Sequence, residues 1–192
     1  MEHTCFFCAK AYADCTECMA RARGHAKRFA MTIATGAKIP SVTLKIVTGE
    51  GIKDVNTAEY FAGKNVVLFS LPGAFTPTCS GKHLPGYVAN ASALKAKGVS
   101  EIMCLSVNDH FTMDAWAAAH DAKGVVTMLA DGNAAFAKAL GIEADMSGFG
   151  MGVRARRGVF HVEDGVVKSV DLEEPGKFEV SSAEACAIRL GK

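Results

Sequence analysis

Two short apolar runs constrain most strongly what this chain can fold into. Val66–Ser70 (VVLFS) and Ile102–Val107 (IMCLSV) each have the length of a strand that is buried on both faces. Between them, apolar residues from Tyr87 to Leu94 recur at helical spacing. A strand, a helix and a second strand in this order predict a βαβ unit with parallel strands.

The remainder of the chain continues the pattern of an α/β domain. Glu163-Asp164-Gly165 separates two strand-like runs, which is a hairpin signal, and Ser182 is well placed to open a last helix. The pattern predicts these further elements: helix 114–120, strand 125–129, helix 134–140, and strands 159–162 and 166–170. We therefore expect a mixed central sheet with helices on both faces.

Composition and charge exclude several classes of protein. The chain has 192 residues, of which 49% are hydrophobic and 21% charged, so it suits one folded domain. A net charge of +1 gives no electrostatic reason to expect nucleic acid or an anionic membrane as a partner. No apolar stretch approaches the roughly 20 residues of a membrane span, and the N-terminus lacks the apolar core of a secretory signal. We therefore expect a cytoplasmic protein with reduced thiols.

Residues 1–30 differ in composition from the rest of the chain. Four of the seven cysteines lie here, in two Cys-x-x-Cys pairs: Cys5, Cys8, Cys15 and Cys18. Two such pairs can bind zinc, but the six residues between them are fewer than usual. Three of the cysteines, Cys5, Cys8 and Cys15, also share one helical face with Tyr12 and Met19. A zinc site, a cysteine-striped helix and an upstream extension without either all remain open. We expect residues 1–30 to be an extension and residues 31–192 to form the domain.

The most informative segment surrounds Cys79. Thr76 and Pro77 suit the N-cap and first position of a helix, because a threonine hydroxyl can accept a bond from an orphan amide and proline has no amide to lose. Cys79 then lies in the first turn, where free N–H groups and the helix dipole favour a thiolate over a thiol. We expect Pro85 to end or kink this helix. A buried cysteine that acts as a small hydrophobe is the alternative, and the polar residues around Cys79 argue against it.

Segment 72–80 (PGAFTPTCS) resembles the active-site signature of the peroxiredoxins, specifically their type II or type 5 branch. The kernel of that signature is a proline, three residues, a threonine, two residues and a cysteine. The resemblance covers the chain from residue 31 onward, through 83–87 (HLPGY), 105–109 (LSVND), 114–116 (DAW), 150–152 (GMG) and 163–167 (EDGVV). It implies a thioredoxin-like fold, and the reduction of hydrogen peroxide and organic hydroperoxides with thiol electrons and no metal or flavin cofactor.

The resemblance also implies roles for individual residues. Cys79 is the nucleophile whose thiolate attacks the O–O bond. Thr76 and an arginine bind the peroxide oxygens, while Pro72 shields the thiolate from water. Counting back from Asp164-Gly165 places the family's arginine at Arg157. A permanently charged guanidinium there would favour the thiolate and stabilise the leaving oxygen.

Nearby residues receive other interpretations. We expect Arg154 and Arg156 to form a solvated surface cluster, and His83 to support the helix through a hydrogen bond. Trp116 and Phe149 are candidates either for the core or for the dimer contact of this branch. The resemblance thus implies a homodimer.

Turnover requires a second thiol, because attack on peroxide leaves Cys79 as a sulfenic acid. Cys104 lies 25 residues later, at the spacing of plant-type relatives, and is the candidate resolving thiol. It also lies inside an expected buried strand, where a cysteine of the core is the competing interpretation. The resolving position of animal-type relatives falls near Ser181, and Cys186 lies in the expected last helix. Glutaredoxin, thioredoxin and glutathione all remain candidate electron donors.

A second class of function competes with the peroxidase. The chain could be a thioredoxin-fold binding or chaperone module, with a zinc-binding segment at residues 1–30. Intact Thr76, Cys79 and Arg157 favour the peroxidase. A peroxide-consumption assay separates the two.

Overall fold

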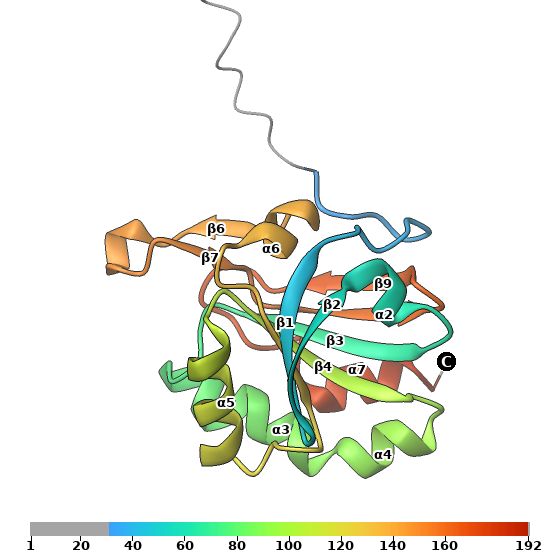
Figure 1. Ribbon diagram of the computed structural model, residues 1–192. Coiled ribbons are helices and arrows are strands. Elements are labelled where there is room, and N and C mark those ends of the chain that lie inside the picture. Colours follow the sequence, from blue (N-terminus) through green and yellow to red (C-terminus); the bar gives the residue numbers. More distant parts are fainter. Residues whose placement is uncertain (1–30, 192) are drawn as a thin grey trace, which may run out of the picture.

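The computed structural model describes residues 31–191. The predicted extension at residues 1–30 lies outside the described residues, and so do its four cysteines, for which a zinc site is one of the open alternatives. Figure 1 shows one large sheet with helices against both of its faces. In the described part of the chain, no helix is long and apolar enough to cross a membrane.

The strands form one large sheet and one small ribbon. Their bounds are β1 Thr43–Thr48, β2 Gly51–Asn56, β3 Asn65–Leu71, β4 Glu101–Ser106, β5 Thr127–Ala130, β6 Glu143–Asp145, β7 Val153–Ala155, β8 Gly158–Glu163 and β9 Val166–Leu172. The large sheet has seven strands in the order β2-β1-β5-β4-β3-β8-β9, and β6 pairs with β7 in the ribbon. Strands β3, β4 and β5 are parallel neighbours, and the other pairs are antiparallel. The expected mixed sheet and βαβ unit are thus confirmed.

The helices are short and cover the sheet on both sides. Their bounds are α2 Thr57–Phe61, the π-helical segment η1 Cys79–His83, α3 Leu84–Ala89, α4 Ala91–Ala96, α5 His110–Ala119, α6 Ala135–Ala139, the 3-10 segment η2 Ser147–Phe149 and α7 Ala183–Arg189. In Figure 1, α3, α4, α5 and α7 lie on one side of the sheet, whereas α2 and α6 lie on the other.

Alternate residues of β3 supply the two cores. Val67 and Phe69 belong to the apolar cluster under α3, α4, α5 and α7, while Val66 and Leu68 belong to the cluster under α2 and α6. Successive side chains of a strand point to opposite faces, so a strand between two helical layers is apolar at every position. This explains why the run was visible in the sequence.

The predicted hairpin turn and the predicted start of the last helix are both present. Asp164 and Gly165 both adopt positive φ, 48° and 70°, which is the conformation of a tight hairpin turn between β8 and β9. The Ser182 hydroxyl accepts a hydrogen bond from Ala185 N–H and caps α7. Helix α5 begins at His110, four residues earlier than predicted, because Asp109 caps it by accepting from Thr112 N–H.

The sequence analysis did not identify β1, β2 or the β6–β7 ribbon. Strand β2 (GIKDVN) is an edge strand whose first four residues are exposed, so it has no apolar face to reveal it. The ribbon strands have three residues each, shorter than the runs on which a periodicity argument depends.

Gly158 lets β8 lie unusually close to β9. A Cβ atom at this position would lie 2.5 Å from Leu172 Cδ2 and 2.8 Å from the backbone oxygen of Asp171. A backbone atom cannot move aside as a side chain can. The strand that directly follows Arg157 is therefore held in place by a contact that needs glycine.

We expect Gly158→Ala to lower the free energy of unfolding by about 1 to 3 kcal/mol, because the added methyl group overpacks the β8–β9 contact. Urea denaturation of the purified protein measures the change. Gly148→Ala is the matched control, since a Cβ at Gly148 meets nothing within 4 Å. Equal losses in the two variants would contradict the close-approach argument.

Candidate active site

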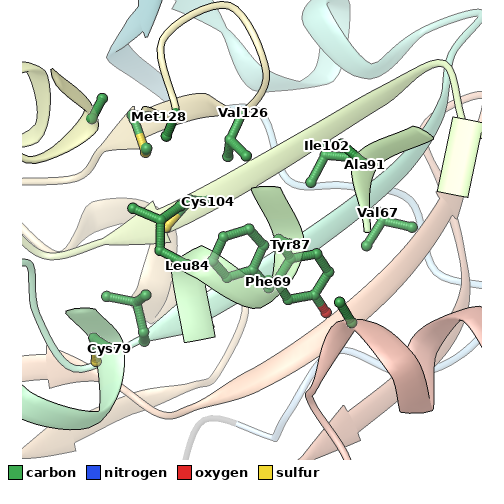
Figure 2. Packing of buried hydrophobic residues seen from close by; sticks show 14 of the residues in the cluster. Val67, Phe69, Cys79, Leu84, Tyr87, Ala91, Ile102, Cys104, Val126 and Met128 are labelled. Carbon is green, nitrogen blue, oxygen red and sulfur yellow. The ribbon is translucent and has the colours of Figure 1, made fainter. Parts of the chain in front are cut away.

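Cys79 lies near the start of a helix and is fully buried. The helix begins at Pro77 and passes through η1, whose first residue is Cys79. Cys79 has an exposed fraction of 0% and belongs to the same apolar cluster as Phe69 and Leu84. Figure 2 shows its sulfur at the border of this cluster. The first-turn position is the one expected from the sequence.

A π-helical turn accommodates Pro85. Proline has no amide to donate, and its ring crowds the carbonyl group four residues earlier in an α-helix. Here Leu84 N–H bonds to the carbonyl oxygen of Cys79, five residues back. The chain therefore remains helical through Pro85 to Ala89, where the sequence led us to expect an end or a kink.

The loop before the helix is held by side-chain bonds to the backbone. The Thr76 hydroxyl donates to the carbonyl oxygen of Gly73 (2.9 Å), and among residues 31–191 no amide donates to it, so the expected N-cap bond is not formed. The Asn108 side-chain oxygen accepts from Ala74 N–H (3.0 Å). Pro72, directly after β3, is half-buried. The predicted signature residues thus lie on one ordered loop at the end of β3.

Arg157 is the arginine that reaches Cys79. Its Nη2 donates to the Cys79 sulfur at 3.4 Å, and its Nη1 lies 2.9 Å from His83 Nδ1. The pairing of β3 with β8 explains this meeting of distant residues, because Ser70 lies opposite Gly158. Arg157 therefore lies next to the point where β3 runs into the signature loop.

His83 is a neutral acceptor in this site. A guanidinium group can only donate, so His83 Nδ1 accepts from Arg157, and the proton on Nε2 is donated to the carbonyl oxygen of Ser181 (3.0 Å). Burial, followed by the positive charge of Arg157, lowers the pKa of His83 from 6.5 to about 3. Tyr87 donates its hydroxyl proton to the same Ser181 oxygen (3.0 Å). The hydrogen bond expected for His83 is present, and it holds the arginine as well as the helix.

Arg154 differs from the expectation of a solvated surface cluster. Its Nε donates to the carbonyl oxygen of Met151 (2.8 Å) and its Nη1 to that of Val107 (3.0 Å), so that expectation is wrong for Arg154. Gly73 is packed against it, since a Cβ there would lie 3.3 Å from Nη1. Arg154 thus ties three loops around the site, whereas Arg157 contacts the sulfur.

Trp116 and Phe149 have different environments. Trp116 is fully buried, and its Nε1 donates to the hydroxyl oxygen of Ser80 at 2.9 Å, which braces the turn that carries Cys79. Phe149 is 83% exposed on η2. Trp116 is therefore a residue of the core, and Phe149 is not.

The other two described cysteines are buried away from solvent. Cys104 lies in the middle of β4 with an exposed fraction of 0%, and Cys186 lies on α7 beside Tyr87. Burial raises the pKa of the Cys104 thiol, and its electrostatic interaction with Cys79 raises it further. Burial also raises the pKa of Cys186, to about 11. Both thiols are weak nucleophiles in this conformation.

Sequence reasoning missed the segment that surrounds Arg157 and His83 from the other side. Phe178 lies 5.7 Å from the Arg157 guanidinium and edge-on to the His83 ring at 5.0 Å. Glu173 N–H donates to the Arg157 carbonyl oxygen (2.9 Å). No local sequence pattern predicts such contacts, because they join residues that are many positions apart in the chain. Among residues 31–191, no cluster of three or more His, Cys, Asp or Glu side chains could hold a metal ion.

The lowered pKa of His83 predicts a pH dependence of stability. Below pH 6.5 the His83 side chain binds a proton in the unfolded chain but not in the folded protein. The free energy of unfolding therefore falls as the pH falls from 6.5 towards 3. Between pH 6.5 and 5 we expect His83 to account for about 1.5 to 2 kcal/mol of the fall. Urea denaturation across this range should show a smaller slope for His83→Asn. His120→Asn, outside this network, should keep the slope of the unmodified protein; equal slopes in all three proteins would contradict the assignment.

Comparisons with known proteins agree with this geometry. The model of the Redoxin family matches residues 34–186. The chain is 50% identical over 162 residues to the chloroplastic peroxiredoxin-2E-2 of Oryza sativa subsp. japonica, covering 80% of this chain and 70% of that protein. It is 46% identical over 158 residues to the chloroplastic peroxiredoxin-2E of Arabidopsis thaliana, covering 80% and 67% of the two chains.

A solved structure shares both sequence and fold. Reduced Prx3 of Vibrio vulnificus in complex with hydrogen peroxide is 50% identical, with a TM-score of 0.79, and the match covers 83% of this chain and 99% of that one. The fold is therefore thioredoxin-like, as the resemblance implied. The chain belongs to the peroxiredoxin family, in its type II/type 5 branch.

Proposed function

We propose that the protein is a thiol-dependent peroxidase in which Cys79 is the reacting thiol. The contact of Arg157 Nη2 with the Cys79 sulfur, at 3.4 Å, is the observation that carries this proposal. A buried thiolate is costly unless a positive charge and hydrogen bonds accompany it. Arg157 supplies both. A relative of this protein, Prx3 of Vibrio vulnificus, has a solved structure in complex with hydrogen peroxide.

The reaction transfers two electrons from sulfur to the peroxide. The thiolate of Cys79 forms a bond to one peroxide oxygen while the O–O bond breaks, and the electron pair leaves with the second oxygen, which takes up a proton to become water or an alcohol. Sulfur ends as a sulfenic acid. Arg157 donates to the leaving oxygen as its negative charge develops. The Thr76 hydroxyl, which already donates to the Gly73 carbonyl oxygen, keeps its lone pairs free to accept a hydrogen bond from the peroxide hydroxyl group.

Pro72 contributes by excluding water. It follows β3 directly and is half-buried at the loop that leads to Cys79. An apolar ring at this point keeps the dielectric around the sulfur low, which strengthens the interaction between the thiolate and Arg157.

We expect Cys79→Ser to abolish peroxide reduction in a folded protein, because a hydroxyl group is far less nucleophilic at neutral pH. Arg157→Met should slow oxidation about 100-fold, since it removes a donor to the leaving oxygen. Stopped-flow oxidation by hydrogen peroxide measures both. Arg154→Met is the control for the loss of a nearby guanidinium and should have a much smaller effect. Near-normal turnover of the serine variant would exclude the peroxidase and leave the binding or chaperone module.

An external thiol is the proposed reductant, with glutathione, glutaredoxin and thioredoxin as the candidates. A thiol R–SH attacks the sulfenic acid to give a mixed disulfide and water, and a second thiol then releases Cys79 as a thiol together with the oxidised donor. The burial of Cys104 within β4 and its raised pKa favour this route over a disulfide between Cys104 and Cys79.

Steady-state peroxide turnover with each donor in turn tests the recycling route. We expect Cys104→Ala to retain turnover within about twofold with the best donor, because a buried thiol of raised pKa is a poor attacking group. Cys186→Ala is the matched control, a second buried cysteine of the same cluster. A loss confined to Cys104→Ala would identify Cys104 as the resolving thiol.

Three expectations from the sequence stay predictions. These are the cytoplasmic location, the homodimer, and the extension at residues 1–30, for which a zinc site is one alternative. Phe149 on η2 and Phe111 on α5 are exposed aromatic side chains, so each is a candidate contact in such a dimer.

A further inference from the structure

A buried carboxylate, that of Glu173, organises the segment behind the site. Glu173 follows β9 directly and is only 5% exposed. One of its oxygens, Oε1, accepts four hydrogen bonds: from the N–H groups of Glu179, Val180 and Ser181 at 2.7, 2.8 and 2.8 Å, and from the Ser181 hydroxyl at 2.8 Å. One oxygen atom thus holds three consecutive residues, 179–181, at the end of the turn that follows Glu173.

The charge on Glu173 strengthens this arrangement. Burial would raise its pKa, but the hydrogen bonds from Ser181, Glu179 and Val180 outweigh burial and lower the pKa overall. Glu173 is therefore ionised at neutral pH. Hydrogen bonds to an ionised acceptor are roughly twice as strong as those between neutral groups.

A chain of hydrogen bonds connects this carboxylate with the reacting sulfur. Glu173 fixes Ser181, whose carbonyl oxygen accepts from His83 Nε2 at 3.0 Å. His83 Nδ1 in turn accepts from Arg157 Nη1 at 2.9 Å, and Arg157 Nη2 contacts Cys79. Each group in the series has one orientation because the next group accepts or donates at a fixed place.

The same segment holds Arg157 at its other end. The backbone N–H of Glu173 donates to the Arg157 carbonyl oxygen at 2.9 Å. Phe178, within the turn, lies against both the guanidinium and the His83 ring. Glu173 thus constrains the backbone of Arg157 directly and its guanidinium through the turn.

We propose that Glu173 is a positioning residue for peroxide reduction, which holds the Arg157 guanidinium in line with Cys79 through Ser181 and His83. Glu173 makes no contact with the sulfur and has no part in bond breaking. The proposal rests on the peroxidase function proposed above. It adds that the rate of sulfur oxidation depends on a carboxylate outside the signature.

The competing explanation is that Glu173 only stabilises the fold. The two differ in what a substitution changes. A purely structural role reduces the fraction of folded protein and leaves the rate constant per folded molecule unchanged at every pH. A positioning role changes the reaction of protein that is folded, and it acts through Arg157 alone.

The test compares Glu173→Gln and Glu173→Ala with the unmodified protein. Glutamine keeps a weaker, neutral acceptor at the same place, whereas alanine removes the acceptor. The measurements are the rate constant for oxidation by hydrogen peroxide from pH 4.5 to 8, by stopped flow, and the folded fraction by circular dichroism. Glu174→Gln is the matched control, because it makes the same chemical change on the exposed neighbouring residue.

We expect the rate constant per folded molecule at pH 7 to fall about threefold for Glu173→Gln and about tenfold for Glu173→Ala, as part of the donor effect is lost. The midpoint of the pH profile should move upward by about half a unit and about one unit, respectively, because a misplaced guanidinium stabilises the thiolate less. Glu174→Gln should match the unmodified protein. If the alanine variant does not fold, the glutamine variant carries the test.

A double variant isolates the route through Arg157. In the Arg157→Met background, Glu173→Gln should change the rate by less than about twofold, because the group it positions has been removed. Unchanged rate and midpoint in the single glutamine and alanine variants would overturn the proposal, and so would a full additional loss in the double variant. An unmodified protein that does not react with peroxide would instead overturn the peroxidase function itself, so the two failures are distinguishable.

Discussion

A guanidinium held 3.4 Å from a fully buried sulfur is the interaction on which the rest of this structure depends. Burying either the guanidinium or a thiolate without a partner of opposite charge would cost free energy. The surroundings therefore have to supply acceptors to the arginine without adding a second positive charge. A neutral His83 meets this need. If His83 were protonated, it would lose its acceptor atom and repel Arg157, so the burial that lowers its pKa to about 3 also preserves the site.

The topology of the sheet brings these groups together. Cys79 belongs to the crossover that follows β3, and Arg157 precedes β8, the antiparallel neighbour of β3. The carboxyl end of one strand thus meets the amino end of the other at the same edge. Ser70 reinforces this junction, because its buried hydroxyl donates to the carbonyl oxygen of Arg156 at 2.7 Å. The close contact between β8 and β9 at Gly158 also restricts the position of the Arg157 backbone.

Much of the fold could be predicted because its signals are local. Continuous apolar runs identify β3 and β4, which are buried on both faces. The pair Asp164-Gly165 identifies the hairpin between β8 and β9, because both residues readily adopt the positive φ of a tight turn. The choice of Arg157 agrees with the observed contact, although its role in the reaction rests on the resemblance to the family. Three features could not be predicted: the direction in which the Thr76 hydroxyl donates, the bonds of Arg154 to carbonyl oxygens, and the backbone bonds to the Glu173 carboxylate. They are bonds between a side chain and a distant backbone, which leave no periodic trace in a sequence.

The π-helical turn decides which residues share the inward side of the helix. In a regular α-helix, residues five positions apart point roughly 140° away from each other, so Cys79 and Leu84 would fall on nearly opposite sides. Both are fully buried here, because the widened turn takes up an extra residue and resets the angular phase of the helix beyond it. The reacting residue and the anchoring residues Leu84 and Tyr87 therefore lie in two different helical registers. Deletion of a single residue between Cys79 and Leu84 would place the two residues four positions apart, where a regular α-helix turns them by only about 40° and keeps both on the inward side.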